Sequence, residues 1–361
     1  MSTQNPVIPT KKTGISLLPL VSKNAVPILF AILCTLAAWL AKMDPWFLAS
    51  EIITRLARNS LLVLALLIPV SAGLGLNFAI VLGAMAGQTA VIAITHYKMT
   101  GLWGFVVAML ASAPLAALLG YLAGKIMNRA KGREMITSMI LGFFVNGLYQ
   151  LVFLFLIGPV IPMQNRSIML PSGVGIRNTV DLFRIEKVLD KLWRPIVLGV
   201  RIPMGTLIFV GLICAAIHFL MRTRLGQQMR TVGQDMHIAG VAGIDVDRTR
   251  IIAMIISTVI AAWGQLIFLQ NISTLNTYNS HEQVGTFAVA ALLVGGATAR
   301  RATIWQAIVG VLLFHTLFIV SPQAGHAIIG VPQIGEYFRV FVAYGVIGVA
   351  LALHAWQSRK S

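Results

Sequence analysis

The sequence has few charged side chains, and acidic ones are the scarcest. Only 11% of its 361 residues are Asp, Glu, Lys or Arg, whereas 57% are hydrophobic. A soluble globular domain carries about 25% charged residues, so this composition excludes an ordinary soluble protein and favours one embedded in a lipid bilayer. The 28 basic residues outnumber the 11 acidic ones. They lie mainly between apolar runs rather than in one stripe, so we expect no nucleic-acid partner.

Cysteines and catalytic motifs are also scarce. Cys34 and Cys214 both fall within apolar runs, whereas a disulfide framework needs more cysteines in aqueous segments. No G-x-x-x-x-G-K-[ST] phosphate loop is present, so this chain is not expected to hydrolyse ATP. The seven histidines are scattered without an H-E-x-x-H motif or a Cys/His cluster, so we expect neither a metal site nor catalytic residues. His315 lies within an apolar run, where it either packs as a neutral side chain or lines a pathway.

Apolar runs, in contrast, are abundant. A membrane-spanning helix needs about 20 mostly apolar residues, and ten runs approach this length. The eighth is too short to cross alone, which is typical of a half-helix covered by protein. We therefore predict an all-α, polytopic membrane helix bundle with about ten transmembrane spans. The ten runs are 24–41, 59–75, 78–96, 102–124, 135–158, 203–221, 251–270, 285–297, 303–320 and 337–355.

Basic residues are unevenly distributed between the two sides of this bundle. Segments on the side of the N-terminus hold 16 of the 28 Lys and Arg residues. Because cytoplasmic loops are enriched in Lys and Arg, both termini are predicted to be cytoplasmic. The first run is read as a retained span rather than a signal peptide. The expected segments are a cytoplasmic N-terminal segment 1–23, a transmembrane domain 24–357 with an extracytoplasmic loop 159–202 and a cytoplasmic loop 222–250, and a cytoplasmic tail 358–361.

No span drawn in this way contains Asp or Glu. A proton- or sodium-coupled carrier usually needs an intramembrane carboxylate, although a sodium site made of carbonyl groups remains compatible. The spans do contain uncharged polar residues, namely Gln88, Asn146, Gln150 and Gln265. Such side chains need partners in lipid. They either form hydrogen bonds between helices or line a path for a neutral hydroxylated solute.

The cytoplasmic loop contains the polar stretch MRTVGQDMHIAGVAGIDVDRTR, which spans 229–250. Gly233 and Gln234 are predicted to break the chain, and Asp235 is a suitable N-cap for a short helix from Met236 to about Ala242. Gly243 is well placed to end that helix. A helix of two turns is not stable alone in water. It therefore packs on its own spans or inserts into a groove of a cytoplasmic partner.

This stretch carries a resemblance to a known family. LGQQMRTVGQDMHIAGVAGIDVDRTRIIAMIISTVIAAWGQ resembles the signature of permease subunits of ATP-binding-cassette importers of the ribose, nucleoside and branched-chain amino acid group. LNFAIVLGAMAGQTAVIA, which keeps Asn77 and Gln88, and FAVAALLVGGATARRATIWQAIVGVLL look like two further elements of that family. Four features depart from the usual pattern and indicate a divergent branch, namely Thr231, Asp235, Gly240 and the arginine pair at 300–301. The loop sequence IPMQNRSIMLPSGVG is closest to the nucleoside and simple-sugar type.

The resemblance implies a type II importer permease in a bacterial inner membrane. Two identical or related permease chains would form the pathway, with two ATPase subunits or a fused ATPase below and an extracytoplasmic solute-binding protein above. ATP and Mg would bind the partner subunits, and this chain would hold no cofactor. The expected solute is a sugar or nucleoside, with branched-chain amino acids and vitamins as alternatives. An ATP-independent facilitator or secondary carrier is the alternative mechanism, and an enzyme is the least favoured function.

Two sets of residues are assigned roles, the first from uncharged polar side chains and the second from the resemblance. The pathway residues would be Asn77, Gln88, Asn146, Gln150 and Gln265. The residues that couple the chain to its ATPase would be Arg230, Gly233, Gln234, Asp235, Met236, His237, Ile238, Ala239, Gly240, Ala242 and Gly243.

Overall fold

The computed structural model describes residues 24–358 except 164 and 198, with side chains described as far as 348. The predicted segment 1–23 and the end of the tail, 359–361, lie outside the described residues. The described chain is mostly helical, in agreement with the predicted fold class. Its helices are α2 (Ala25–Leu40), α3 (Pro45–Leu64), α4 (Leu67–Ser71), α5 (Ile80–His96), α6 (Gly101–Arg129), α7 (Glu134–Leu151), α8 (Val188–Leu192), α9 (Met204–Arg222), α10 (Arg224–Gln234), α11 (Met236–Val241), α12 (Val246–Ile272), α13 (Glu282–Val294), α14 (Ile304–Ile329) and α15 (Pro332–Ser358).

The strands are short and lie in the segments that connect these helices. β1 (Thr179–Asp181) pairs antiparallel with β4 (Thr274–Asn276), and β2 (Ile196–Val197) pairs with β3 (Val200–Arg201). A π-helical turn, Val152–Leu156, extends α7. The pairing of β1 with β4 fastens the predicted extracytoplasmic loop to the turn between α12 and α13.

Six helical segments among the described residues are long and apolar enough to cross a membrane. Three further apolar helices, α2, α5 and α13, are shorter. The 13 residues of α13 extend for about 20 Å at 1.5 Å per residue, so the eighth run is too short to cross alone, as predicted. The total of ten crossings stays a prediction. The six candidate spans are Pro45–Ser71, Gly101–Arg129, Glu134–Leu156, Met204–Arg222, Val246–Ile272 and Ile304–Ile329.

The second span begins earlier than its apolar run. Asp44 caps α3 by accepting a hydrogen bond from Phe47 N at 2.8 Å, and Pro45 occupies the first turn, where proline is well tolerated. The prediction that no span contains Asp or Glu is therefore wrong, because α3 carries Glu51 together with Arg55 and Arg58. Hydropathy excluded this polar half of the helix, whereas its N-terminal cap and its packing against α12 and α14 keep it helical.

Helices α5 and α12 form the centre of the bundle and approach each other closely. A Cβ atom added at Gly83 would collide with the carbonyl oxygen of Thr258, and one at Gly87 would meet the carbonyl oxygen of Ala262 at 2.6 Å. The small residues of this segment therefore allow close packing of the two helices. Most of α5 is buried as a result.

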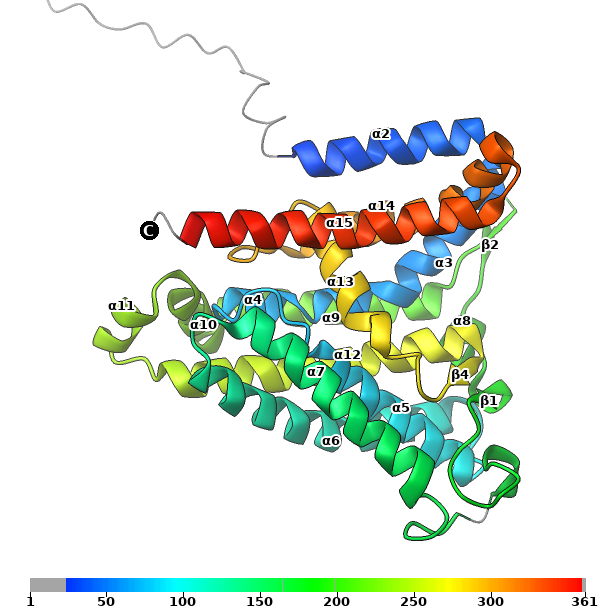
Figure 1. Cartoon of the computed structure of the whole chain (residues 1–361), viewed down its shortest axis with the longest axis horizontal. Coiled ribbons are helices and arrows are strands. Elements are labelled where there is room, and N and C mark those ends of the chain that lie inside the picture. The colour runs from blue at the N-terminus through cyan, green and yellow to red at the C-terminus, as the bar shows by residue number, and fades with distance from the viewer. Residues whose placement is uncertain (1–23, 164, 198, 359–361) are drawn as a thin grey trace, which may run out of the picture.

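The elements divide between two ends of the bundle (Figure 1). The first residues of α2, the C-terminal end of α15, α10 and α11 lie at one end, which we call the α11 end. β1, β4 and α8 lie at the opposite end, which we call the β-loop end. The segments 222–250 and 159–202 therefore lie toward opposite ends of the bundle, and the side of the membrane that each faces stays a prediction.

Candidate functional site

The short helix at the α11 end forms as predicted. The side chain of Asp235 accepts hydrogen bonds from His237 N at 2.8 Å and Ile238 N at 2.9 Å, which is the geometry of an N-cap. Gly243 has a φ of +78° directly after the helix end, a left-handed conformation that glycine adopts without strain. Ile238 and Val241 are 62% and 79% exposed. The helix therefore presents an apolar knob at this end of the bundle.

The predicted chain break lies one position later than expected. α10 continues to Gln234, and the extended residue is Asp235, with φ −156° and ψ 113°. Gly233 lies within α10, where the helix packs closely against the chain at Ser71. A Cβ atom at Gly233 would collide with the Ser71 carbonyl oxygen. The prediction that Gly233 and Gln234 break the chain is thus wrong. The glycine serves close packing instead.

The other residues predicted to couple to an ATPase fall into two groups. Arg230 donates from Nη2 to the carbonyl oxygen of Met221 at 2.6 Å and so caps the end of α9, and Ala239 is buried against the bundle. Most members are exposed. The exposed ones are Arg230, Gln234, Asp235, His237, Ile238, Gly240, Ala242 and Gly243.

A buried arginine attaches α11 to two long helices. Arg250, in the first turns of α12, is 0% exposed. Its Nη2 contacts Glu134 Oε1 at 2.5 Å, at the start of α7, and its Nη1 lies 3.4 Å from the sulfur of Met236, the first residue of α11. We call this the Arg250 tie. The sequence gives no local signal for it, because 116 residues separate the arginine from its carboxylate.

Two of the five predicted pathway residues meet through a third side chain. His281 Nδ1 lies 2.6 Å from Gln88 Oε1, and His281 Nε2 lies 2.7 Å from Asn146 Oδ1. Asn146 also donates from Nδ2 to Glu282 Oε1 at 3.1 Å. These contacts join α5, α7 and the start of α13. Because the polar atoms face one another, hydrogen bonding between helices describes this pair better than lining of a pathway.

The other three predicted pathway residues are dispersed. Asn77 accepts a hydrogen bond from Ala79 N at 2.9 Å, in the turn before α5. Gln265 donates from Nε2 to the carbonyl oxygen of Ser280 at 3.4 Å. The side chain of Gln150 makes no hydrogen bond within the described part of the chain, and it is half-buried on α7. None of the five predicted residues lines the cavity described next.

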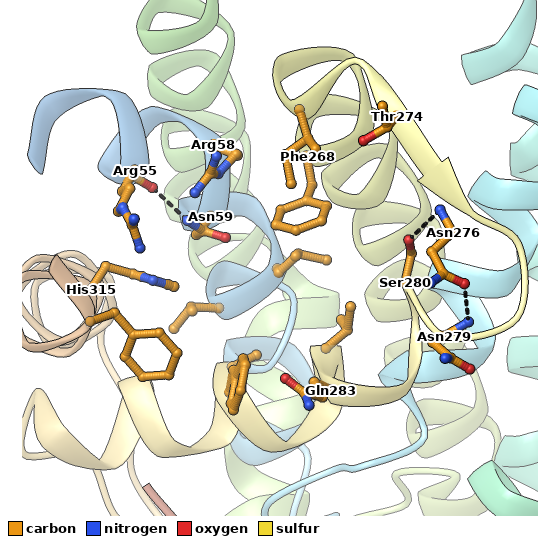
Figure 2. Close-up of a pocket in the computed structure, with 17 residues that line it drawn as sticks. Arg55, Arg58, Asn59, Phe268, Thr274, Asn276, Asn279, Ser280, Gln283 and His315 are labelled. Carbon is orange, nitrogen blue, oxygen red and sulfur yellow. Dashed lines mark hydrogen bonds between the residues drawn. The ribbon is translucent and has the colours of Figure 1, made fainter. Parts of the chain in front are cut away.

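The cavity that best suits a polar solute lies between α3, α12, α13, α14 and the turn after β4. Its volume is about 430 Å³, within the range of about 300–1,000 Å³ that ligand sites occupy. We call it the arginine cavity because Arg55 and Arg58 line it. Figure 2 shows Arg55 and His315 on one side, and Asn276 and Ser280 on the other.

His315 belongs to this cavity lining, which favours the second of its two interpretations. Its ring also contacts Phe314 and Phe318, with centroid separations of 5.5 and 5.9 Å. A second cavity of about 420 Å³, between α5, α6 and α7, is lined by apolar side chains apart from Thr89 and Tyr149. It offers few partners for a polar solute.

Comparison with known proteins identifies the family of this chain. The family model described as "Branched-chain amino acid transport system / permease component" matches residues 48–351. The chain belongs to this family. The family consists of transport permeases, so the protein is a multi-pass membrane permease rather than an enzyme. The resemblance seen in the sequence is confirmed.

One curated relative is the fructose import permease protein FruG of Bifidobacterium longum (strain NCC 2705). It is 24% identical to this chain over 240 residues, which cover 65% of this chain. The match spans 63% of the length of the relative. No solved structure matches the chain significantly.

Proposed function

We propose that the chain is the transmembrane permease subunit of an ATP-binding-cassette importer and that α11 receives the motion of a separate ATPase. The observation that carries the proposal is the form of α11. It is a capped helix of two turns that exposes Ile238 and Val241, while Arg250 attaches its first residue to α7 and α12. A partner groove that clamps the knob would move these helices together, as in a rigid-body transition.

The other components follow from family membership. A second permease chain, identical or related, would complete the pathway, and an extracytoplasmic binding protein would deliver solute at the β-loop end. ATP and Mg would bind the ATPase, which this chain lacks. The α11 end would then face the cytoplasm of a bacterial cell, with the chain in the inner membrane. The solute that we favour is a sugar, because the relative from Bifidobacterium longum is a fructose import permease.

The test is co-purification of an ATPase from native membranes in mild detergent, followed by reconstitution. Ile238→Glu and Val241→Glu place a charge on the knob without touching the buried Ala239, so they should release the ATPase while the chain still inserts and folds. Phe183→Glu is a matched control, because Phe183 is equally exposed, at 68%, outside α11. It should retain the ATPase.

Two outcomes would contradict the proposal. Normal solute-stimulated ATPase activity in both knob variants would remove α11 from the coupling. Solute uptake by vesicles that contain only this chain would instead support the ATP-independent carrier.

A further inference from the structure

Two arginines lie deep within one membrane span. Arg55 and Arg58 are one turn apart on α3, within the candidate span Pro45–Ser71. Arg55 is ten residues from the start of this 27-residue segment, or about 15 Å along its axis at 1.5 Å per residue, so it lies within the segment rather than at its end. Charged residues at that depth are costly and mark solute pathways or other functional sites.

The partners of these arginines leave much of their donor capacity free. The nearest carboxylate oxygen to Arg55 Nε belongs to Glu51 at 3.6 Å, which is beyond hydrogen-bond distance. Arg58 donates from Nη1 to Asn271 Oδ1 at 3.2 Å, and Asn271 in turn donates to Asp190. Within the described part of the chain, the Nε atoms of both arginines are buried and have no hydrogen-bond partner. A guanidinium carries five N–H donors in a planar fork that matches a carboxylate or a phosphate.

The lining of the arginine cavity contains no carboxylate among the described residues. The acidic residues that balance the arginines lie outside the lining. Arg58 also lies over the ring of Phe268, with its central carbon 5.4 Å from the centroid. This stacking fixes the plane of one guanidinium at the cavity wall. The cavity therefore presents positive charge with no negative charge of its own.

The opposite wall offers hydroxyl and amide groups. The turn after β4 is held by its own hydrogen bonds, because Asn276 N donates to Ser280 Oγ at 3.0 Å and Asn279 N donates to Asn276 Oδ1 at 3.2 Å. In the described structure the side chains of Thr274, Asn279 and Gln283 form no hydrogen bond. Figure 2 shows Thr274 and Asn279 across the cavity from Arg55 and His315, with Gln283 between the two sides. They suit the hydroxyl groups of a small polyol.

Charge decides between the candidate solutes. A neutral sugar would bring no anionic partner to the cavity side of the two guanidinium groups, whose balancing carboxylates lie outside the lining, and an amino acid would bring an ammonium group to a wall that has no carboxylate. We propose that the arginine cavity binds a polyol of the size of a monosaccharide that carries one acidic group. The acidic group contacts Arg55 and Arg58, and the hydroxyl groups contact Asn279 and Gln283. The assignment of this solute as the transported one rests on the proposed importer function.

The experiment measures binding of paired probes to the full chain in lipid nanodiscs by isothermal titration calorimetry. D-glucuronate is compared with D-glucose, and D-ribose 5-phosphate with D-ribose, so that each pair differs mainly by the acidic group. The acidic member of at least one pair should bind about tenfold or more tightly, the gain typical of charge-assisted hydrogen bonds. The pair that shows the gain distinguishes a carboxylate from a phosphate.

Variants connect this preference to the cavity. Arg55→Gln and Arg58→Gln should each reduce affinity for the acidic member by about tenfold and leave affinity for the neutral member unchanged. Lys191→Gln, which removes an exposed positive charge outside the cavity lining, should change neither. Asn279→Ala keeps every charge, so it should weaken both members of a pair even if the arginine variants fail to fold.

The inference is overturned if neither acidic sugar binds more tightly than its neutral counterpart, or if folded arginine variants keep the preference. Its failure differs from failure of the importer proposal. Tighter binding of a neutral sugar, together with a co-purified ATPase, would leave the importer in place and remove the acidic solute. Binding of an acidic sugar by a chain that retains no ATPase would support the acidic solute and contradict the importer proposal.

Discussion

The Arg250 tie gives a quantitative prediction for the attachment of α11. Arg250→Met removes the cation and leaves the Glu134 carboxylate in a site where that side chain is only 10% exposed. Breaking a buried ion pair by removing one partner costs about 3–5 kcal/mol. The double variant Arg250→Met with Glu134→Leu also removes the stranded charge. It should lose much less stability than the sum of the two single changes.

The assay is equilibrium unfolding of the purified full chain in detergent, followed by circular dichroism, with the free energy of unfolding compared among variants. Lys131→Met is a matched control. Lys131 pairs with Asp247 at 2.6 Å in the same region, but both side chains are about half exposed, and exposed pairs contribute about 0–1 kcal/mol. A cost for Arg250→Met no larger than that for Lys131→Met would refute the reasoning that this pair is a buried tie.

Two further predictions concern contacts between helices. Gly83→Val should destabilise the chain by about 1–3 kcal/mol or more, because its side chain would collide with the Thr258 carbonyl. Gly142→Val is the control and should cost much less, because its site has no neighbour within 4 Å. Equal melting temperatures for the two variants would count against close packing of α5 on α12. His281→Ala should lower the free energy of unfolding by about 1–3 kcal/mol, because it strands buried polar groups, Gln88 among them. An unchanged thermal melting curve would show that this histidine does not hold α5, α7 and α13 together.

The sequence predicted the parts of the fold that depend on local composition. Long apolar runs indicated membrane helices because each span must bury about 20 successive residues in lipid. The short helix at Met236 could be predicted from Asp235 and Gly243, since capping is decided by residues within one turn of the helix end. The family signature lies in the same local stretch, and for that reason the resemblance was visible without a structure.

The errors arose where packing overrode local signals. Hydropathy placed the start of the second span at residue 59 and so left out its polar N-terminal half. Asp44 caps the helix at Pro45, and packing against α12 and α14 keeps that half helical. Gly233 resembled a chain break by residue type. The close approach of Ser71 shows why a glycine is needed inside α10.

What the sequence determined by itself is the class of protein and the position of α11, because hydropathy and capping depend on neighbours along the chain. Only the tertiary structure decided which polar groups meet. The Arg250 tie joins residues 116 positions apart, and the contact between His281 and Gln88 spans 193. The arginine cavity likewise gathers side chains from four helices and a turn. Such long-range contacts depend on how helices pack across the bundle, and a local pattern of residues does not predict that packing.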